Sequence, residues 1–532
     1  MADQTAAAPV PVAAEHSLRR DVSVWGSFMW GFADVGADIY AALGIVIAAT
    51  MGAAPLAFAA AGLVYIMIGL AYTELASAYP MAGGGQYFVS RGLGDVAGFI
   101  AGSALLLDYT IDIALFAVFS AGYMNFFLPA LRDFKITLGP FPLIGTLANV
   151  TPLWAAETAL LIVFLTWLNV RGVRESSLLN EFIGAFGLIV EGGLIIIGLV
   201  FAWKPELLVD QWVHQFPTLN QFMYGSSLAI ISYVGLESIS QAAQETRRPG
   251  TVIPRTSIGL IGSVFLFAVF FSITGLGLLP WQAYAKDVDH SVALFADRLP
   301  FVGAVAGPLA AVLGAVILLI SANTGVMGAS RLVYSMSQLS LLTPWFREVH
   351  PRYRTPARAI LIFSGIGLLE AMLAFLTPSA VDALANMYAF GATLGYTLVF
   401  VALISLRIND PYSPRPYRVP LNVRLKRKDG QVVAIPLIGL LGLLGVLITL
   451  TEVVLTHAIG RIAGPIWVIA CFGYYVAYRR RRGLPVWQSV RHRWEEQQRA
   501  ILKDAEEYDL LETYEFALAQ RDRRLARGHA RG

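Results

Sequence analysis

The sequence predicts an all-α integral membrane protein with twelve transmembrane helices. Its 532 residues are 56% hydrophobic and only 14% charged, and the mean hydropathy is +0.62. A soluble domain usually carries about 25% charged residues. The charges here gather at the two ends and in short segments between apolar runs of about 20 residues, the length that an α-helix needs to cross the hydrocarbon core of a bilayer.

Twelve apolar segments, taken in chain order, give the predicted number of spans. Each is rich in aliphatic and aromatic residues and is followed by a polar or charged stretch. The segments lie at residues 24–48, 56–78, 96–127, 153–169, 178–203, 222–243, 256–279, 302–336, 359–376, 381–406, 435–455 and 463–478.

The basic residues between the spans predict the orientation of the chain. If the N-terminus is cytoplasmic, the inside segments hold 17 Lys and Arg residues and the outside segments hold 6. Cytoplasmic segments are enriched in basic residues, so both ends are expected to be cytoplasmic in a multi-pass protein of the cell membrane. Residues 1–22 do not have the pattern of a signal peptide, and the single cysteine, Cys471, excludes an intramolecular disulfide.

Two of the spans share a motif that suggests an internal repeat. The first contains Val35-Gly36-Ala37-Asp38, and the sixth contains Val234-Gly235-Leu236-Glu237. Many transporters consist of two inverted five-helix repeats whose first helices are broken at the bilayer midplane. A glycine costs about 1 kcal/mol of helix propensity relative to alanine, which favours a break at each motif. Chance is the alternative, because Val-Gly pairs are common in membrane helices.

Several longer stretches resemble the amino acid–polyamine–organocation (APC) superfamily of permeases. They read ELASAYP at 74–80, GGGQY at 83–87, GLESISQ at 235–241, ETRRP at 245–249 and ASRLVYSM at 329–336. The resemblance implies a 5+5 inverted repeat with broken first and sixth helices, two peripheral helices and alternating access. It implies a substrate held between the first, third, sixth, eighth and tenth helices.

The resemblance divides the chain into three parts. A cytoplasmic N-terminal tail covers 1–22, the twelve-helix permease domain covers 23–480, and a charged, helical, cytoplasmic C-terminal tail covers 481–532. The C-terminal tail is interpreted as an amphipathic helix near the membrane face, with regulation or an oligomer contact as the alternative. A short hairpin is expected at 424–433, centred on Asp429-Gly430.

One departure from the family bears on the substrate. Amino acid permeases of this superfamily usually have a Gly-Ser-Gly-Ile-like break in the first helix, whose free amides bind the substrate carboxylate. The corresponding stretch here is Gly36-Ala37-Asp38-Ile39. Because the Asp38 carboxylate would repel a substrate carboxylate, amino acid recognition of the usual kind is in doubt.

Five carboxyl groups lie in the three helices that the resemblance places around one site. Asp34 and Asp38 are in the first helix, Asp108 and Asp112 are in the third, and Glu237 is in the sixth. The four-residue spacing of the third-helix pair puts both on one helical face. No Lys or Arg lies inside these segments, so the acids must be protonated, hydrated or paired with a cation. Helix packing for the third-helix pair and a structural role for Glu237 are the alternatives.

Further residues complete the predicted site. Around the breaks, the backbone and side chains expected to bind substrate or ion are those of Gly36, Tyr40, Tyr233, Gly235 and Ser238. Glu191 in the fifth helix is a candidate proton carrier. A sodium-type site is expected at Ser321, Asn323 and Thr324 in the eighth helix, although such hydroxyls also bond to their own helix.

These features favour a secondary active transporter for an amino acid or related amine, cationic and proton-coupled. A transporter for potassium or another monovalent cation is the alternative, and a channel or transporter-like sensor is a third class. No nucleotide loop, metal-ligand cluster or nucleophile–base pair indicates an enzyme, so neither cofactor nor metal is expected. The partners are the lipid bilayer, the substrate and a coupling ion, with a proton favoured over sodium. Nucleic acid is not expected, and the oligomeric state is open.

Overall fold

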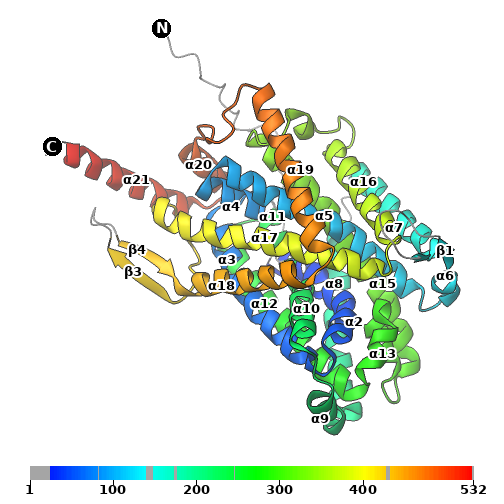
Figure 1. The fold of residues 1–532 in the computed structure, drawn as a ribbon. Helices are drawn as coiled ribbons and strands as arrows, with labels where there is room; N and C mark the ends of the chain where they lie inside the picture. Colours follow the sequence, from blue (N-terminus) through cyan, green and yellow to red (C-terminus); the bar gives the residue numbers. More distant parts are fainter. Residues whose placement is uncertain are drawn as a thin grey trace.

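The computed structural model describes residues 24–81, 83–138, 148–172, 176–235, 237–244, 246–426 and 432–529, so the predicted N-terminal tail lies outside the described part. The described chain is almost entirely α-helical (Figure 1). It contains eleven segments that are long and apolar enough to cross a membrane. The predicted all-α membrane class is therefore confirmed.

The first of these segments covers two of the predicted spans. It runs for 55 residues, Val24–Ala78, and the chain changes direction inside it at Met51, where φ is +52°. Each of the other ten segments coincides with one predicted span. The count of twelve and the inverted repeat stay predictions.

The first predicted helix is interrupted in its apolar middle. It consists of α1 (Val24–Gly31), the π-helical turn η1 (Phe32–Gly36) and α2 (Asp38–Thr50). The interruption is thus a widened helical turn rather than an unwound segment. π-Helical turns within α-helices occur frequently at functional sites.

The sixth predicted helix is unwound in its middle. It begins as α10 (Leu219–Leu228), tightens into the 3₁₀ turn η4 (Ala229–Tyr233) and resumes as the short α11 (Glu237–Gln241). Between the two halves Val234 is extended, and Gly235 has φ +112°. Glycine tolerates this backbone conformation, which other residues adopt only with strain.

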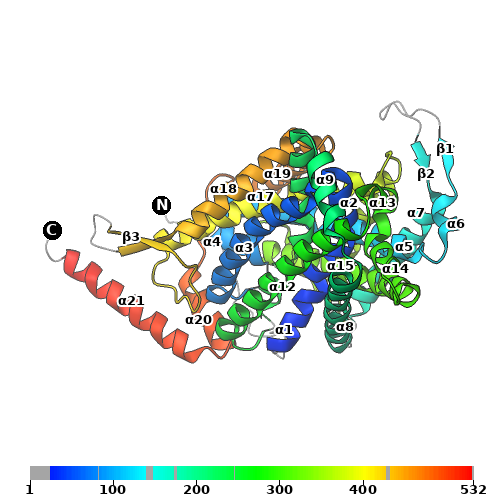
Figure 2. The same cartoon turned by 90° about the horizontal axis from the view of Figure 1, so that it is seen from below.

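The core forms around α5 (Asp95–Met124), which is buried along its length. The helices α15 (Gly303–Gln338) and α17 (Ala380–Asn409) pack along it, and α12 (Pro249–Leu278) packs along α3 (Ala54–Ala78) (Figure 2). Outer helices present exposed apolar side chains that fit a lipid environment; they are α7 (Pro152–Arg171), α8 (Ser176–Ile197), α18 (Leu437–Thr456) and α19 (Gly460–Arg481).

Shorter elements connect the spans. They include α4 (Gly84–Leu93), α6 (Pro129–Asp133), α9 (Pro205–His214), α13 (Trp281–Lys286) and α14 (Ser291–Asp297). The helix α16 (Ala357–Ala374) is itself one of the eleven candidate spans. The turns are η2 (Met51–Ala53), η3 (Gly198–Ala202), η5 (Ala242–Gln244), η6 (Val288–His290) and η7 (Pro344–Arg347). Strands β1 (Ile136–Leu138) and β2 (Ala148–Val150) pair antiparallel.

Two further features lie at the end of the molecule that carries the C-terminus. Strands β3 (Asn422–Lys426) and β4 (Val432–Pro436) pair antiparallel where the sequence predicts a hairpin, although the predicted centre, Asp429-Gly430, lies outside the described residues. The C-terminal tail forms α20 (Trp494–Asp504) and α21 (Tyr508–His529).

Buried polar contacts fasten the last helices to the rest of the protein. Asp95, the first residue of α5, forms an ion pair with Arg479 of α19, and both side chains are fully buried. At the opposite end of α19, the ring of His457 is also buried, with Nε2 2.8 Å from the Ser227 hydroxyl on α10. Peripheral helices are thereby tied both to α5 and to the first half of the interrupted sixth helix.

Candidate functional site

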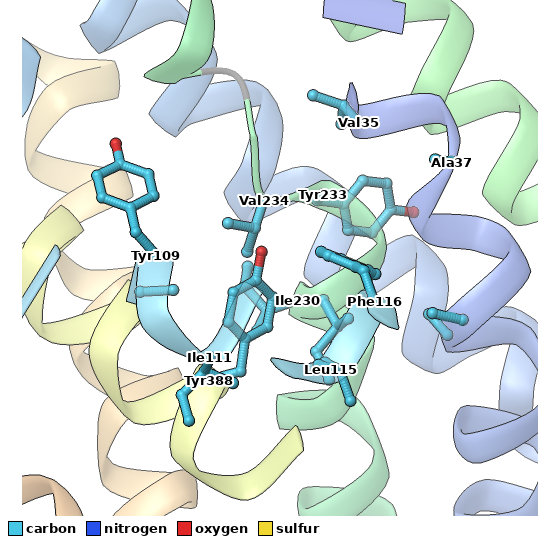
Figure 3. Packing of buried hydrophobic residues seen from close by; sticks show 14 of the residues in the cluster. Val35, Ala37, Tyr109, Ile111, Leu115, Phe116, Ile230, Tyr233, Val234 and Tyr388 are labelled. Carbon is cyan, nitrogen blue, oxygen red and sulfur yellow. The ribbon is translucent and has the colours of Figure 1, made fainter. Parts of the chain in front are cut away.

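The two helix interruptions touch each other at the centre of the molecule. A Cβ atom added to Gly235 would lie 3.0 Å from Val35 Cγ2 and 3.1 Å from Asp34 Oδ2. Figure 3 shows the extended segment at Val234 running between Tyr109 on one side and Val35 and Ala37 on the other. A side chain at 235 would crowd the Val35 and Asp34 side chains, and the φ of +112° also favours glycine at this position.

A hydroxyl cluster from α15 meets the acids of the first interruption. The Thr324 hydroxyl donates to Asp34 Oδ1, and Ser321 Oγ lies 3.3 Å from the same atom. Ser321 Oγ is also 3.5 Å from the Asp34 carbonyl oxygen and 3.4 Å from Asp38 Oδ1. A hydroxyl has one hydrogen to donate, so Ser321 cannot satisfy all three acceptors, and the oxygens that are left could bind a cation.

Asn323 lies apart from this cluster. Its side-chain oxygen accepts a hydrogen bond of 2.6 Å from Asn169 on α7, and its amide nitrogen is 3.5 Å from Met327 Sδ. Ser321 and Thr324 are three residues apart and share a helical face, whereas Asn323 points to a different side of α15. The structure thus brings two of the three predicted sodium-site residues to the acids.

The Glu237 side chain bonds to the backbone of the second interruption. Its Oε2 accepts hydrogen bonds from the Gly235 amide (3.2 Å) and from the Tyr396 hydroxyl on α17 (3.0 Å). Its Oε1 has no hydrogen-bond partner among the described residues, nor does the Ser238 hydroxyl next to it. One carboxylate oxygen thus fixes the unwound backbone while the other is left for a ligand.

The third-helix acids are buried, and three of their four carboxylate oxygens have no hydrogen-bond partner within the described chain. Asp108 is completely buried and Asp112 is 7% exposed. Both oxygens of Asp108 and one of Asp112 lack hydrogen-bond partners within the described chain. Asp108 lies beside Glu237, and two ionised carboxylates in contact repel each other. A shared proton or a bound cation would relieve that repulsion.

The glycines of neighbouring helices allow α5 to approach so closely. A Cβ at Gly325 on α15 would lie 2.8 Å from Asp112 Cβ, and one at Gly391 on α17 would lie 3.0 Å from the Asp108 amide nitrogen. A side chain at either glycine would push α5 away. These glycines carried no signal in the sequence analysis, because single glycines are frequent in membrane helices.

The two predicted site tyrosines differ in what their hydroxyls can do. The Tyr233 ring stacks on Tyr65 with centroids 5.0 Å apart, and its hydroxyl donates to the Phe58 carbonyl at 2.8 Å. That hydroxyl is therefore committed to the fold. The Tyr40 hydroxyl is buried without a partner in the described chain, while its backbone carbonyl accepts from Tyr123 at 2.9 Å.

Glu191 lies on α8, which packs against α1 and η1 of the first interrupted helix. Its side chain is fully buried, and neither carboxylate oxygen has a hydrogen-bond partner among the described residues. Gly36 is buried inside η1, where an added Cβ would lie 2.9 Å from Phe32 Cζ. Gly36 therefore serves packing of the π-helical turn as well as the break.

Sequence reasoning missed a contact that closes the site toward the tail. Gln241, the last residue of α11, donates its side-chain amide to the Tyr109 hydroxyl on α5. A Cβ at Gly328 on α15 would meet both Tyr109 (2.9 Å) and the Gln241 Oε1 atom (3.1 Å). The helices α5, α11 and α15 thus meet at one point on the side of the acids that faces the tail. Neither residue has a sequence pattern that marks such a contact.

A separate cavity of about 560 Å³ opens at the end of the molecule opposite the tail. Basic and acidic side chains both line it, among them Arg132, Lys135, Lys286, Asp289 and Asp382. Asp34, Asp38, Asp108, Asp112 and Glu237 do not line this cavity, and none of the five is more than 7% exposed. The central site is therefore enclosed in this structure.

Known proteins are similar in sequence to almost the whole membrane region. A family model described as amino acid permease matches residues 22–476. The chain is 26% identical to a branched-chain amino acid permease of Bacillus subtilis over 419 residues, covering 76% of this chain and 85% of the relative. It is 28% identical to a methylthioribose transporter of the same bacterium over 413 residues, with the same coverage. It is also 28% identical to the human cationic amino acid transporter 4 over 414 residues, covering 76% of this chain and 62% of that protein.

Proposed function

We propose, from the premise that the chain belongs to the amino acid permease family, that it is a secondary active transporter for a cationic amino acid or a related amine. The family resemblance expected from the sequence is thereby confirmed. The relatives are transporters and not enzymes, and the chain is accordingly a multi-pass membrane transporter. Substrate, coupling ion and orientation in the cell membrane, with both ends cytoplasmic, belong to the proposal.

The observation that carries the proposal is an enclosed group of five carboxyls without a countercharge. Within the described chain, no Lys, Arg or His side chain forms an ion pair with any of the five (Asp34, Asp38, Asp108, Asp112 and Glu237). Burying unpaired carboxylates is strongly unfavourable. A substrate ammonium or guanidinium group would supply the missing positive charge.

The names of relatives agree with this chemistry only in part. Cationic amino acid transporters are among them, but so are a branched-chain amino acid permease and a methylthioribose transporter. The aspartates of the first interruption therefore support a cationic substrate more directly than the sequence similarity to these relatives does. A neutral zwitterion would have to place its carboxylate near Asp38.

The two interruptions support movement of the substrate by alternating access. Transporters with broken helices bind the substrate at the breaks and open the site to one side at a time. The contact between Asp34 and Gly235 and the bond between Gln241 and Tyr109 lie where such a path would open and close. Transport would require these contacts to separate in turn.

Proton coupling is the favoured mode, because more acids are buried than a monocation can neutralise. Glu191, buried with both oxygens unpartnered among the described residues, is the candidate carrier. Sodium is the alternative, since Ser321, Thr324 and the Asp34 carbonyl present several oxygens to one point. Oxygen ligands of that kind suit a hard cation.

Potassium transport is the second candidate function. The same carboxylates and hydroxyls could coordinate a bare alkali ion, which needs no room for an organic group. The enclosure of the acids in this structure is compatible with so small a substrate.

Uptake by purified protein in sealed vesicles tests the two functions together. Labelled lysine, labelled spermidine and rubidium are offered separately, each with and without an inward proton gradient or sodium gradient. Accumulation of lysine or spermidine that follows the proton gradient supports the proposal. Rubidium uptake without organic uptake would replace it with the potassium function, and dependence on sodium alone would refute proton coupling.

Asp38→Asn tests the residue on which the cationic assignment depends most. Its amide keeps the size of the side chain and removes the charge, so we expect the apparent affinity for lysine to fall by about tenfold or more, because one charged contact is lost. Unchanged affinity and rate would remove Asp38 from the site.

A further inference from the structure

The C-terminal tail, here Leu484–Arg524, folds back against one end of the membrane domain, which we call the tail-side face. Figures 1 and 2 show α20 beside α4, and α21 extending away from the body. A small apolar cluster of Leu502, Tyr514 and Leu518 joins the two tail helices. The tail is thus a folded element packed on the transporter.

One part of the tail is attached to the start of α5. The Ser489 hydroxyl accepts a hydrogen bond of 2.9 Å from the Asp95 amide, and the Val490 amide donates to Asp95 Oδ2 at 2.9 Å. His492 Nε2 lies 2.8 Å from Asp95 Oδ1. Asp95 is 1% exposed, so these contacts are shielded from water and are strong.

A second part is attached to α4 and to the end of α3. Gln498 is completely buried; its oxygen accepts from Arg91 on α4 at 2.8 Å, and its nitrogen donates to the Ala78 carbonyl at 2.9 Å. The Trp494 ring meets the Tyr87 ring edge-on at 5.7 Å. This attachment is also buried.

A third part reaches the start of α12 and is more exposed. Glu507 Oε1 accepts a hydrogen bond of 2.8 Å from the Gly250 amide, and the preceding Glu506 pairs with Arg247 at 3.4 Å with both side chains more than half exposed. Arg248 is the N-cap residue of α12, and its side chain forms no capping hydrogen bond. The tail therefore supplies a carboxylate to a helix N-terminus, where negative charge is stabilising.

The tail consequently joins two elements that border the enclosed site on this side. The helix α5 carries Asp108 and Tyr109. The helix α11, which carries Glu237 and Gln241, is followed in the chain by the turn η5 and then by α12. The hydrogen bond between Gln241 and Tyr109 links α11 to α5 on the side of the acids that faces the tail. The tail contacts the starts of both α5 and α12, so any opening that moves α11 and α12 away from α5 would have to break one of these two attachments.

We propose that the tail is a latch on opening of the site toward the tail-side face, and that it stays fastened to α4 and α5 while releasing α12 at Glu507. The inference rests on the proposed transport function, because only a transporter needs this opening. The buried contacts of Asp95 and Gln498 are costly to break. The contacts at α12 are the weaker ones, because the Arg247–Glu506 pair is exposed and exposed ion pairs contribute little, and the Gly250–Glu507 hydrogen bond is only partly buried.

The first test measures opening without any substrate. In purified full-length protein with Cys471→Ser, a reporter cysteine replaces Ser240 on α11, and its rate of reaction with a water-soluble maleimide is followed. Glu507→Ala removes the α12 contact and is expected to raise the labelling rate about 2- to 10-fold, as for the loss of one hydrogen bond. Glu507→Gln keeps an acceptor but loses the charge that favours the helix N-terminus, so its rate should lie between those of the parent and Glu507→Ala.

A matched control alters the tail without touching α12. Glu495 of α20 bonds to Arg521 of α21, so Glu495→Ala loosens the tail internally and should leave the labelling rate unchanged. Equal labelling of the parent and Glu507→Ala, both with monodisperse profiles and parent-like melting temperatures, would overturn the latch. Faster labelling in Glu495→Ala to the same extent would also overturn it, because release would then not be specific to α12.

A second test holds the latch shut. A cysteine at Gly250 would lie near Leu510, whose Cδ1 is 3.1 Å from the added Cβ, so Gly250→Cys and Leu510→Cys in the Cys471→Ser background can be bridged by a cleavable bifunctional thiol reagent. Bridging should abolish labelled lysine uptake, and reductive cleavage should restore it. A bridge between Glu495→Cys and Arg521→Cys should have no effect.

Uptake that continues through a verified 250–510 bridge would overturn the latch. Absence of lysine uptake even in the unbridged protein would instead contradict the proposed substrate class, and the labelling test would still decide the latch. The two failures are therefore distinguishable.

Discussion

At the scale of single residues, the site depends on positions where a side chain is absent. Gly235 has φ +112° and lies against Val35 and Asp34. Alanine there would combine an unfavourable backbone conformation with a contact of 3.0 Å. The acids can approach the unwound segment only because this position is glycine.

Gly235→Ala is therefore expected to lower both stability and transport. The strained backbone should cost about 1–3 kcal/mol, seen as a lower melting temperature, and displacement of Asp34 should reduce uptake to a small fraction. Gly193→Ala is the matched control, because no atom lies within 4 Å of its added Cβ and alanine favours a helix. Equal melting curves and uptake for the two variants would refute the role of Gly235.

The chemical identity of the site residues was predictable from the sequence, but their contacts were not. A Val-Gly-x-acid motif in two spans and two acids four residues apart indicate an acidic centre. Which hydroxyl reaches which acid depends on helix rotation: Ser321 and Thr324 contact Asp34, whereas Asn323 bonds to Asn169. That rotation is set by packing between helices distant in sequence.

At the scale of elements, the interrupted sixth helix needs a fixed beginning if its unwound middle is to stay in place. Thr218 caps α10 with a reciprocal arrangement in which its hydroxyl accepts from the Gln221 amide and the Gln221 side chain accepts from the Thr218 amide. The capping box satisfies two backbone donors that the short helix leaves open.

Thr218→Ala should destabilise the protein by about 1 kcal/mol, because the hydroxyl accepts from the Gln221 backbone amide and donates to the Gln221 side chain. Thr218→Ser keeps the cap and should melt like the parent. Differential scanning fluorimetry in detergent measures the melting temperatures of both variants. If the serine variant falls as far as the alanine variant, the cap is not the cause.

Hydropathy predicted where the spans lie but could not predict how they break. The first interruption is a π-helical turn and the sixth is unwound, although their motifs are alike. The difference follows the neighbours: the acid of the second motif, Glu237, accepts a hydrogen bond from the Gly235 amide, whereas the acid of the first motif, Asp38, lies 3.4 Å from the Ser321 hydroxyl on α15. Such long-range partners are not visible in a single local motif.

At the scale of the whole molecule, buried polar groups join the peripheral helices to the core and make stability depend on pH. Burial lowers the pKa of His457 to about 4, against the opposing effect of its hydrogen bonds to the backbone of Asn386 and Tyr224. In the unfolded chain its pKa is near 6.5. Between these values the unfolded state binds more protons than the folded state, so stability is present above about pH 6.5 and is lost as pH falls toward 4.

The free energy of unfolding should therefore drop by up to about 3 kcal/mol through this window because of His457. His457→Gln can still bond to Ser227 but does not titrate, so its melting temperature should fall less between pH 7 and pH 4.5 than that of the parent. Parallel curves for the two proteins would show that His457 does not titrate in this way.

The ion pair between Asp95 and Arg479 has a consequence for the time course of biosynthesis. The two residues are 384 positions apart, and a ribosome adds about 5–20 residues per second. Asp95 therefore enters the membrane roughly 20 to 80 s before its partner is made. During that interval its carboxylate must stay at the water interface or pair with a substitute, so this end of the molecule is completed only after almost the entire chain has been synthesised.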